Sequence, residues 1–346
     1  MVRPSRASTG KIVIIMTVFL TGATGFVGSA VLRQLLLAGH EVRVLARKGG
    51  DRRNIEGVSC EVIEGDLGDA NTYKAALKGC SGLFHVAADY RIWAPDALAM
   101  NRINVDGTRD LLRLSAECGI ERIVYTSSVA TLGLNKDGTP SNESTPCNYT
   151  DMIGVYKRSK FLAEAEVQRL VSEESIPVVI VNPSAPIGPR DIKPTPTGRI
   201  VLDAARGKMP AYVDTGLNFV HVEDVADGHI LAYKNGEVGQ RYILGGENYT
   251  LLQMLTEISD LVGLKPPSIK LPQNALLPIA YLVESASRLT GNWEPFVTVD
   301  GVKMSKKLMY FSSDKAKETL GYKTQAVNTA VVDAVEWFRK NGYLQP

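Results

Sequence analysis

Two side chains four residues apart, Tyr156 and Lys160, have the types and the spacing that acid–base chemistry needs. In a helix this spacing places both on one face. A phenol ordinarily titrates at about pH 10, and a nearby ammonium favours the phenolate, so the tyrosine can exchange a proton near neutrality. Ser128 follows an apolar run, where its hydroxyl would donate to the oxygen of a reacting carbonyl or alcohol. The three residues predict proton transfer at such a group, with Lys160 also holding the ribose of a nicotinamide cofactor.

A glycine-rich turn near the start of the chain strengthens this interpretation, because the tyrosine–lysine spacing alone occurs by chance in many helices. Gly22, Gly25 and Gly28 follow an apolar run at 12–20, which we interpret as the first buried strand, and precede a helix-periodic run. Gly22 would allow a tight turn, Gly25 a close approach of pyrophosphate, and Gly28 close packing of the helix. The alternative, a turn that binds nothing, is disfavoured by the strand and helix on either side. Other expected cofactor contacts in the turn are Thr24, Phe26 and Val27.

The end of the second expected strand bears on the choice of cofactor. An acidic residue there would bind the 2′-hydroxyl of NAD, but this chain has Arg47, whose guanidinium suits a 2′-phosphate. NADP is therefore favoured over NAD, with a solvated basic turn as the alternative. After the third strand, Asp66 would accept a hydrogen bond from the adenine amino group and Leu67 would lie against the ring. Asp66 could instead cap the following short helix.

These residues require a scaffold in which strands and helices alternate. Near-continuous β-branched runs separated by amphipathic stretches predict a parallel, doubly wound α/β sheet covered on both faces. After the run at 12–20, the expected strands are 41–45, 60–64, 82–86, 122–126 and 178–181. The expected helices include 95–118, 156–173, 251–262 and 328–340.

The organisation of the chain changes after Asn182, where several prolines mark irregular structure. We expect residues 1–15 to be a flexible extension and residues 16–184 to form a dinucleotide-binding Rossmann domain. Residues 185–346 would form a smaller substrate-binding lobe, from which a segment at about 219–245 returns to the Rossmann domain. Such a lobe would cover the carboxyl ends of the strands, where ligands bind in open α/β sheets.

Composition excludes several classes of function. The net charge of +2 over 346 residues gives no electrostatic reason to expect a nucleic-acid partner. Four scattered cysteines, without a C-x-x-C pair, predict free thiols, no metal site and a cytoplasmic location. We expect no integral membrane segment, because the basic, apolar start of the chain is too short to span a bilayer. The apolar stretch 276–283 is interpreted as a core-facing helix of the small lobe.

Together these motifs resemble the extended short-chain dehydrogenase/reductase superfamily. The resemblance covers nearly the whole chain from Met16 and includes the motifs at 21–28, 66–67, 85–88, 104–108, 126–128, 156–160 and 219–226. It implies that Ala87 and Ala88 line the cofactor, that Asn104 supports the active site and that Pro183 faces the nicotinamide. It also implies a homodimer built from the helices at 95–118 and 156–173. Asp224 suits the N-cap of the next helix.

Within the superfamily, the chain is most similar to the hopanoid-associated sugar epimerases. The stretches that carry this similarity are 85–93, 127–133, 187–199 and 242–248. The segment around Phe84 to Ala87, together with Arg47, also resembles dihydroflavonol 4-reductases, which use NADPH. One hypothesis is therefore a sugar epimerase or dehydratase that retains its cofactor, and the other is a carbonyl reductase that exchanges NADP(H) at each turnover. A non-catalytic dinucleotide sensor is disfavoured, because such proteins usually lose the tyrosine or the lysine.

The substrate is expected to be a small molecule, a sugar or a carbonyl compound. Nucleotide-sugar epimerases usually carry a cation before the segment that here begins at Phe219, but this chain has Asn218. A UDP-sugar is therefore disfavoured, although cations of the 190–199 segment could replace the missing one. The candidate substrate contacts are Tyr90, Arg91, Asn182, Arg190 and Lys193.

Overall fold

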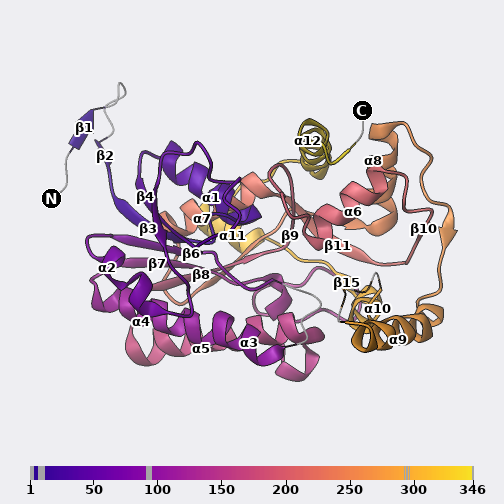
Figure 1. The fold of residues 1–346 in the computed structure, drawn as a ribbon, viewed down its shortest axis with the longest axis horizontal. Helices are drawn as coiled ribbons and strands as arrows, with labels where there is room; N and C mark the ends of the chain where they lie inside the picture. Colours follow the sequence, from indigo (N-terminus) through magenta and orange to yellow (C-terminus); the bar gives the residue numbers. More distant parts are fainter. Residues whose placement is uncertain are drawn as a thin grey trace.

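Seven parallel strands form the central sheet of the protein, as the computed structural model shows for residues 4–6, 12–90, 96–291, 293, 295 and 297–344 (Figure 1). Their order in space is β12-β8-β7-β6-β3-β4-β5. The chain starts at β3, fills one side of the sheet and then returns to fill the other, so the strand order reverses between β3 and β6. The predicted doubly wound sheet is confirmed, and its ligand crevice is expected at this reversal. The strands are β3 (Thr17–Thr21), β4 (Glu41–Ala46), β5 (Glu61–Glu64), β6 (Gly82–His85), β7 (Arg122–Thr126), β8 (Val178–Pro183) and β12 (Arg241–Leu244).

The first strand is shorter than the apolar run predicted. Strand β2 (Ile12–Ile14) pairs antiparallel with β1 (Pro4–Arg6), outside the central sheet. The sheet strand begins only at Thr17, opposite Glu41, and Val18 faces Gly82 on the other side. The prediction of one buried strand over 12–20 is therefore wrong, because both neighbouring strands begin at this level and leave the earlier residues without partners in the central sheet.

Two apolar cores cover the two faces of the sheet. Alternate residues of β3 divide between them, with Val18 and Leu20 in one core and Phe19 in the other. In Figure 1 the helices above the sheet are α1 (Phe26–Leu37), α7 (Val222–Asn235) and α11 (Asp314–Leu320). Those below it are α2 (Lys74–Leu77), α4 (Thr108–Glu117) and α5 (Gly154–Glu174). Both faces are thus buried, as the apolar strands require.

The long helix predicted at 95–118 is interrupted by a π-helical turn. It consists of α3 (Ala97–Asn101), the π turn η2 (Arg102–Gly107) and α4, and its predicted first residue, Pro95, lies outside the described residues. Asn104 lies in the π turn and is buried. Single π turns inside α-helices frequently occur at functional sites.

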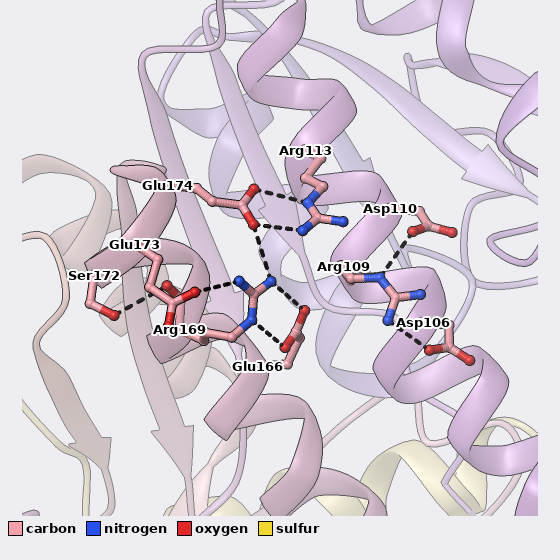
Figure 2. Close-up of polar contacts among 9 residues, drawn as sticks. All are labelled: Asp106, Arg109, Asp110, Arg113, Glu166, Arg169, Ser172, Glu173 and Glu174. Carbon is pink, nitrogen blue, oxygen red and sulfur yellow. Dashed lines mark hydrogen bonds and ion pairs between the residues drawn. The ribbon is translucent and has the colours of Figure 1, made fainter.

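Ion pairs join α4 to α5 along their outer surface (Figure 2). Arg113 donates to Glu174 at 2.6 and 2.9 Å, and Arg169 of α5 reaches the same carboxylate at 3.1 Å. Arg169 also contacts Glu166 and Glu173. The two helices therefore present one continuous charged surface.

The C-terminal half builds a second, smaller sheet with its own apolar core. Its strands are β9 (Ala185–Ile187), β11 (Gly216–His221), β13 (Glu247–Thr250) and β15 (Leu308–Met309). The core includes residues of α6 (Pro196–Ala205), α8 (Leu251–Val262) and α12 (Val327–Lys340), of which α8 and α12 were predicted. Two short strands, β10 (Ala211–Tyr212) and β14 (Ile269–Lys270), pair with each other. The boundaries proposed for the two domains stay a prediction.

The capping prediction for Asp224 in this half is wrong. His221, not Asp224, caps α7 by accepting from the amide of Glu223, while Asp224 accepts from Gln325 of the segment before α12. The apolar helix α9 (Gln273–Leu289) packs on α10 (Val299–Ser305) and has only Ala280 and Ser287 buried. Ala280 packs with Val299 and Val302, and Leu276 and Leu277 lie against this cluster, so one side of the helix faces an apolar core, as predicted. No helix in the described part of the chain has the length and apolarity needed to cross a membrane.

Candidate active site

The glycine turn lies at the carboxyl end of β3 and leaves room for a dinucleotide. Gly22 has φ of +81°, and a Cβ there would lie 2.7 Å from the backbone nitrogen of Ala87. A Cβ at Gly28 would collide with the carbonyl oxygen of Gly22. A Cβ at Gly25 would meet only that same oxygen, at 3.3 Å, a tight contact that a shift of a few tenths of an ångström relieves. Gly22 and Gly28 therefore have the steric reasons that the sequence predicted, whereas the approach of a pyrophosphate at Gly25 stays a prediction.

The start of α1 offers backbone donors to an anion. Gly25 is the N-cap, no side chain caps the helix, and the first turn has no acidic residue. The free N–H groups and the positive end of the helix dipole suit a pyrophosphate. Phe26 and Val27 begin the helix and are half-buried, as is Thr24. The turn therefore fits the cofactor predicted for it.

The basic turn after β4 contains one guanidinium without a partner. Arg52 pairs with Glu64 and Arg53 with Asp51, whereas Arg47 is exposed and its side chain forms no hydrogen bond or ion pair with the described residues. Arg47 is thus the arginine of this turn that is free to meet a ligand.

Asp66 does not cap the short helix after β5. The cap is Asp69, which accepts from the amide of Asn71 at 3.2 Å, whereas Asp66 accepts from the amide of Gly68 at 2.8 Å. The capping alternative for Asp66 is therefore wrong. The side chain of Leu67 is buried beside Gly107, where an added Cβ would lie 3.1 Å from it.

A buried histidine connects the glycine turn to the π turn. His85 Nδ1 lies 2.7 Å from Thr21 Oγ1, and its Nε2 lies 2.9 Å from Thr108 Oγ1. Thr108 donates to the carbonyl of Asn104, so it accepts from Nε2–H, and Thr21 donates to Nδ1 while accepting from the amide of Ala87. Burial lowers the pKa of His85 to about 3, so the ring is neutral. This network fixes Ala87 against the glycine turn, and Ala88, the next residue, is exposed.

Asn104 organises the segment on the other side of the crevice. Its Oδ1 accepts from the amide of Asp89 at 2.7 Å, and its Nδ2 donates to the Asp89 carbonyl and to Ser159 Oγ at 3.0 Å. Ser159 precedes Lys160 on α5. Asn104 therefore ties the chain after β6 to the helix that carries the tyrosine and the lysine.

Ser128 lies close enough to Tyr156 to affect its phenol, as their predicted roles require. Ser128 follows β7 and caps the short 3-10 helix η3 (Val129–Thr131), while Tyr156 lies in the first turn of α5. Burial raises the pKa of Tyr156 and the nearby Tyr90 raises it further, whereas a hydrogen bond from Ser128 lowers it. Tyr156 is therefore protonated at neutral pH.

Lys160 forms its hydrogen bonds with residues of β7 and not with the phenol of Tyr156. Its Nζ donates to the carbonyl of Thr126 at 2.8 Å and to the hydroxyl of Tyr125 at 3.0 Å, and its side chain is buried. Burial lowers the pKa of Lys160 to about 7, and the Glu164 carboxylate counteracts that shift. The predicted lowering of the Tyr156 pKa by Lys160 is not among the effects that act on the phenol here.

Glu164 is a buried residue of the site that sequence reasoning missed. It follows Lys160 by four residues, and this spacing was the available signal. Its carboxylate accepts from Asn182 Nδ2 at 2.8 Å and Thr131 Oγ1 at 2.9 Å, and it pairs with Arg241 at 3.1 Å. Asn182 also donates to the Ser128 carbonyl at 3.0 Å and is fully buried. This placement favours a positioning role for Asn182 over the predicted substrate contact.

The other candidate substrate residues do not all point into one common site. Tyr90 contacts the Tyr156 ring edge-on, whereas Arg91 lies outside the described residues. The guanidinium of Arg190 turns toward Glu223, and Lys193 is exposed near Asp51, whose pKa it helps to lower. Pro183 is buried at the end of β8.

Comparison with known proteins agrees with this architecture. The model of the NAD dependent epimerase/dehydratase family matches residues 18–245. A Synechocystis sp. protein named dihydroflavonol 4-reductase is 44% identical, over 94% of this chain and 96% of its own. Sterol demethylase protein B of Methylococcus capsulatus is 33% identical, over 95% and 100% respectively. The crystal structure of gox2253 superimposes with a TM-score of 0.86 at 53% identity, covering 95% of this chain and 99% of that one. The chain therefore belongs to the NAD dependent epimerase/dehydratase family, among the extended short-chain dehydrogenases/reductases that its motifs resemble, and is an NAD(P)-dependent enzyme.

Proposed function

We propose that the protein is an NADPH-dependent carbonyl reductase of the dihydroflavonol 4-reductase kind. The observation that carries the proposal is the free guanidinium of Arg47 at the end of β4. Arg52 and Arg53 are already paired with carboxylates, so among the arginines of this turn Arg47 is the one available for a 2′-phosphate. A cofactor that is exchanged at each turnover is what a reductase needs.

The environment of Asn218 argues against a nucleotide-sugar substrate. This residue stands where nucleotide-sugar epimerases usually carry a cation, and it is buried. Its amide donates to Asn248 Oδ1 at 2.8 Å and to the carbonyl of Phe311 at 3.1 Å, and its oxygen accepts from the amide of Gly246 at 2.9 Å. The hydrogen bonds of Asn218 therefore join β11 to its neighbouring segments. Its neutral side chain cannot form an ion pair with a diphosphate.

The protonation state of Tyr156 also suits reduction. Bound NADPH would supply the hydride that reduces the carbonyl carbon. Tyr156, protonated because burial raises its pKa, would donate its proton to the carbonyl oxygen, and Ser128 would hold that oxygen by a hydrogen bond. The ammonium of Lys160 would hold the nicotinamide ribose.

A hopanoid-associated sugar epimerase or dehydratase is the second candidate. The family model that matches residues 18–245 favours it, as do the long motif stretches at 85–93 and 187–199. Such an enzyme oxidises and then reduces its substrate on one cofactor, so it must retain that cofactor throughout the cycle.

Cofactor content and affinity separate the two candidates. We expect freshly purified protein to be empty or partly loaded, and to bind NADP more tightly than NAD. Arg47→Ala should abolish this preference, because a charge-assisted contact to phosphate is lost, while the matched variant Arg52→Ala, whose guanidinium is already paired, should keep it. Stoichiometric NAD retained through purification would contradict the reductase and support the epimerase.

We further propose that the protein is a homodimer formed through α3, α4 and α5. The ion pairs of Figure 2 join α4 and α5 within one chain, and exposed leucines lie on α3 and α5, with Leu98 71% and Leu162 37% exposed. The double variant Leu98→Glu/Leu162→Glu should give a monomer by light scattering. Leu37→Glu, on α1 and 79% exposed, should leave the dimer intact. A wild-type protein that is monomeric at micromolar concentration would refute this proposal.

The division into a cofactor domain at 16–184 and a substrate lobe at 185–346 is part of the same proposal. The four cysteines are free, as predicted, which supports a cytoplasmic location.

A further inference from the structure

A polar cavity lies behind the glycine turn, between α1, the loop after β9 and the end of the chain. It has a volume of about 260 Å³, far more than the roughly 10–15 Å³ that one water needs. Three arginines from three different segments line it, together with Asn54, Ile192 and residues at the end of α12. The arginines are Arg33, Arg53 and Arg190.

The positive charge of this cavity is not balanced by its carboxylates. Arg33 donates to the carbonyl oxygens of Ser29 and Asn54, at 2.9 and 3.1 Å, and forms no ion pair with the described residues. Arg53 pairs with Asp51 and Arg190 with Glu223. Three guanidinium groups therefore share two carboxylates.

Two further observations point to an anion-binding site. The Nε of Arg190 is buried and has no hydrogen-bond partner, and a buried unpaired donor is costly. Burial and the like charge of Arg33 lower the pKa of Arg190 to about 10, so the two guanidinium groups repel each other. An oxyanion between them would accept from both and relieve the repulsion.

Asn54 separates this cavity from the cofactor side of the glycine turn. It lines the cavity and is buried, and its Nδ2 lies 3.3 Å from the carbonyls of Thr24 and Gly25 and 3.1 Å from that of Arg190. The amide groups of the turn that face a pyrophosphate thus lie on the other side of this side chain. Arg47, the residue proposed for the 2′-phosphate, does not line the cavity.

We propose that this cavity is an oxyanion-binding site, distinct from the cofactor site, which holds a phosphate-sized group between Arg33 and Arg190 with Arg53 at its edge. The group can be a free phosphate or the phosphate of a larger metabolite. The indole of Trp337 and the ring of Tyr343 form an apolar wall beside the arginines, and this wall suits the organic part of such a molecule.

Inorganic phosphate, titrated by calorimetry at constant ionic strength, tests the proposal on the full-length protein. We expect saturable binding that persists with saturating NADP and in Arg47→Ala. Arg33→Met should weaken binding at least about tenfold, because one charge-assisted donor is lost. Arg113→Met, which removes an arginine from the α4–α5 surface, should leave binding unchanged. If Arg33→Met fails to fold, Arg53→Gln provides a milder change with the same expected direction.

The outcomes separate this site from the proposed function. Phosphate binding that NADP displaces, or that Arg47→Ala abolishes, would assign the anion to the cofactor site and overturn the inference. Absence of saturable binding up to tens of millimolar phosphate would overturn it as well. Because the measurement is of binding and not of turnover, its result does not depend on which reaction the enzyme catalyses.

Discussion

The ring of Tyr90 meets the ring of Tyr156 edge-on, with 4.6 Å between the ring centroids and an interplanar angle of 68°. Tyr90 follows the segment that Asn104 fixes through Asp89, so the π turn, the chain after β6 and the proposed proton donor form one connected unit. The orientation of the Tyr156 ring thus depends on residues from outside α5.

Removing the Tyr90 ring should therefore impair catalysis without removing the proton donor. An edge-to-face aromatic pair contributes about 0.5–1.5 kcal/mol, so Tyr90→Ala should lower kcat about 2–10-fold. Tyr90→Phe keeps the ring and should stay within about twofold of the wild type. NADPH oxidation with a reducible carbonyl compound measures both, and equal losses in the two variants would show that the hydroxyl matters and the ring contact does not.

Replacing Tyr156 by Phe should abolish most of the activity. The variant keeps the ring and its packing but has no proton to donate, so kcat should fall about 10²–10⁴-fold. The melting temperature and the affinity for NADP should remain close to those of the wild type. Turnover near the wild-type rate would refute the assignment of Tyr156.

The turn glycines should respond differently to the same substitution. Gly28→Ala places a methyl group against the carbonyl oxygen of Gly22, so it should destabilise the fold by about 1–3 kcal/mol. Gly25→Ala needs a shift of only a few tenths of an ångström and should fold, but its methyl group would obstruct the pyrophosphate and weaken cofactor binding. Urea denaturation and cofactor titration measure the two effects, and a destabilised Gly25→Ala would contradict this steric difference.

Glu164 should control the pH range of activity through Lys160. Its carboxylate raises the pKa of Lys160, so Glu164→Gln should lower that pKa below about 7. If catalysis needs the charged lysine, kcat/KM decreases as pH rises through this pKa, and in Glu164→Gln that decrease should begin at a lower pH. Glu166→Gln, two residues away and paired with Arg169, is the matched control and should keep the wild-type profile. An unshifted profile in Glu164→Gln would exclude this coupling.

The buried Lys160 should also make stability depend on pH. Its pKa is about 7 in the folded protein and about 10.4 in the unfolded chain, so between these values the unfolded state binds more protons. The free energy of unfolding of the cofactor-free protein should therefore rise with pH in this range. Between pH 7 and 9.5 the rise should exceed that of Lys160→Met by up to about 3 kcal/mol. Urea denaturation at the two pH values tests this, and parallel behaviour of the two proteins would contradict it.

Residues whose partners are close in the sequence could be predicted well. The steric roles of Gly22 and Gly28 were predicted because strand, turn and helix are local, and β7 was predicted from its β-branched residues alone. The cap of α7 and the first residue of β3 were not predicted correctly, because residues far away in the sequence determine both. Asp224 is held by Gln325, and the first sheet strand begins where Glu41 and Gly82 bring its neighbours alongside.

In the candidate active site, too, contacts between residues far apart in the sequence could not be predicted. The spacing of Tyr156 and Lys160 indicated one helical face, but the contacts that Lys160 makes come from β7. Asn182 and Glu164 meet because β8 lies beside α5, which no local pattern reveals. Chemistry could therefore be predicted from residue types, whereas positioning residues depend on tertiary contacts.

The position of β12 at the edge of the central sheet has a consequence for biosynthesis. This strand pairs with β8, yet nearly sixty residues separate Pro183 from Arg241 along the chain. At about 5–20 residues per second, the ribosome needs about 3–12 s to synthesise that interval. During this time the apolar edge of β8 has no partner strand, and an exposed strand edge favours aggregation. We expect nascent chains stalled before residue 241 to engage chaperones, and chains that extend past residue 244 and clear the exit tunnel to be released from them.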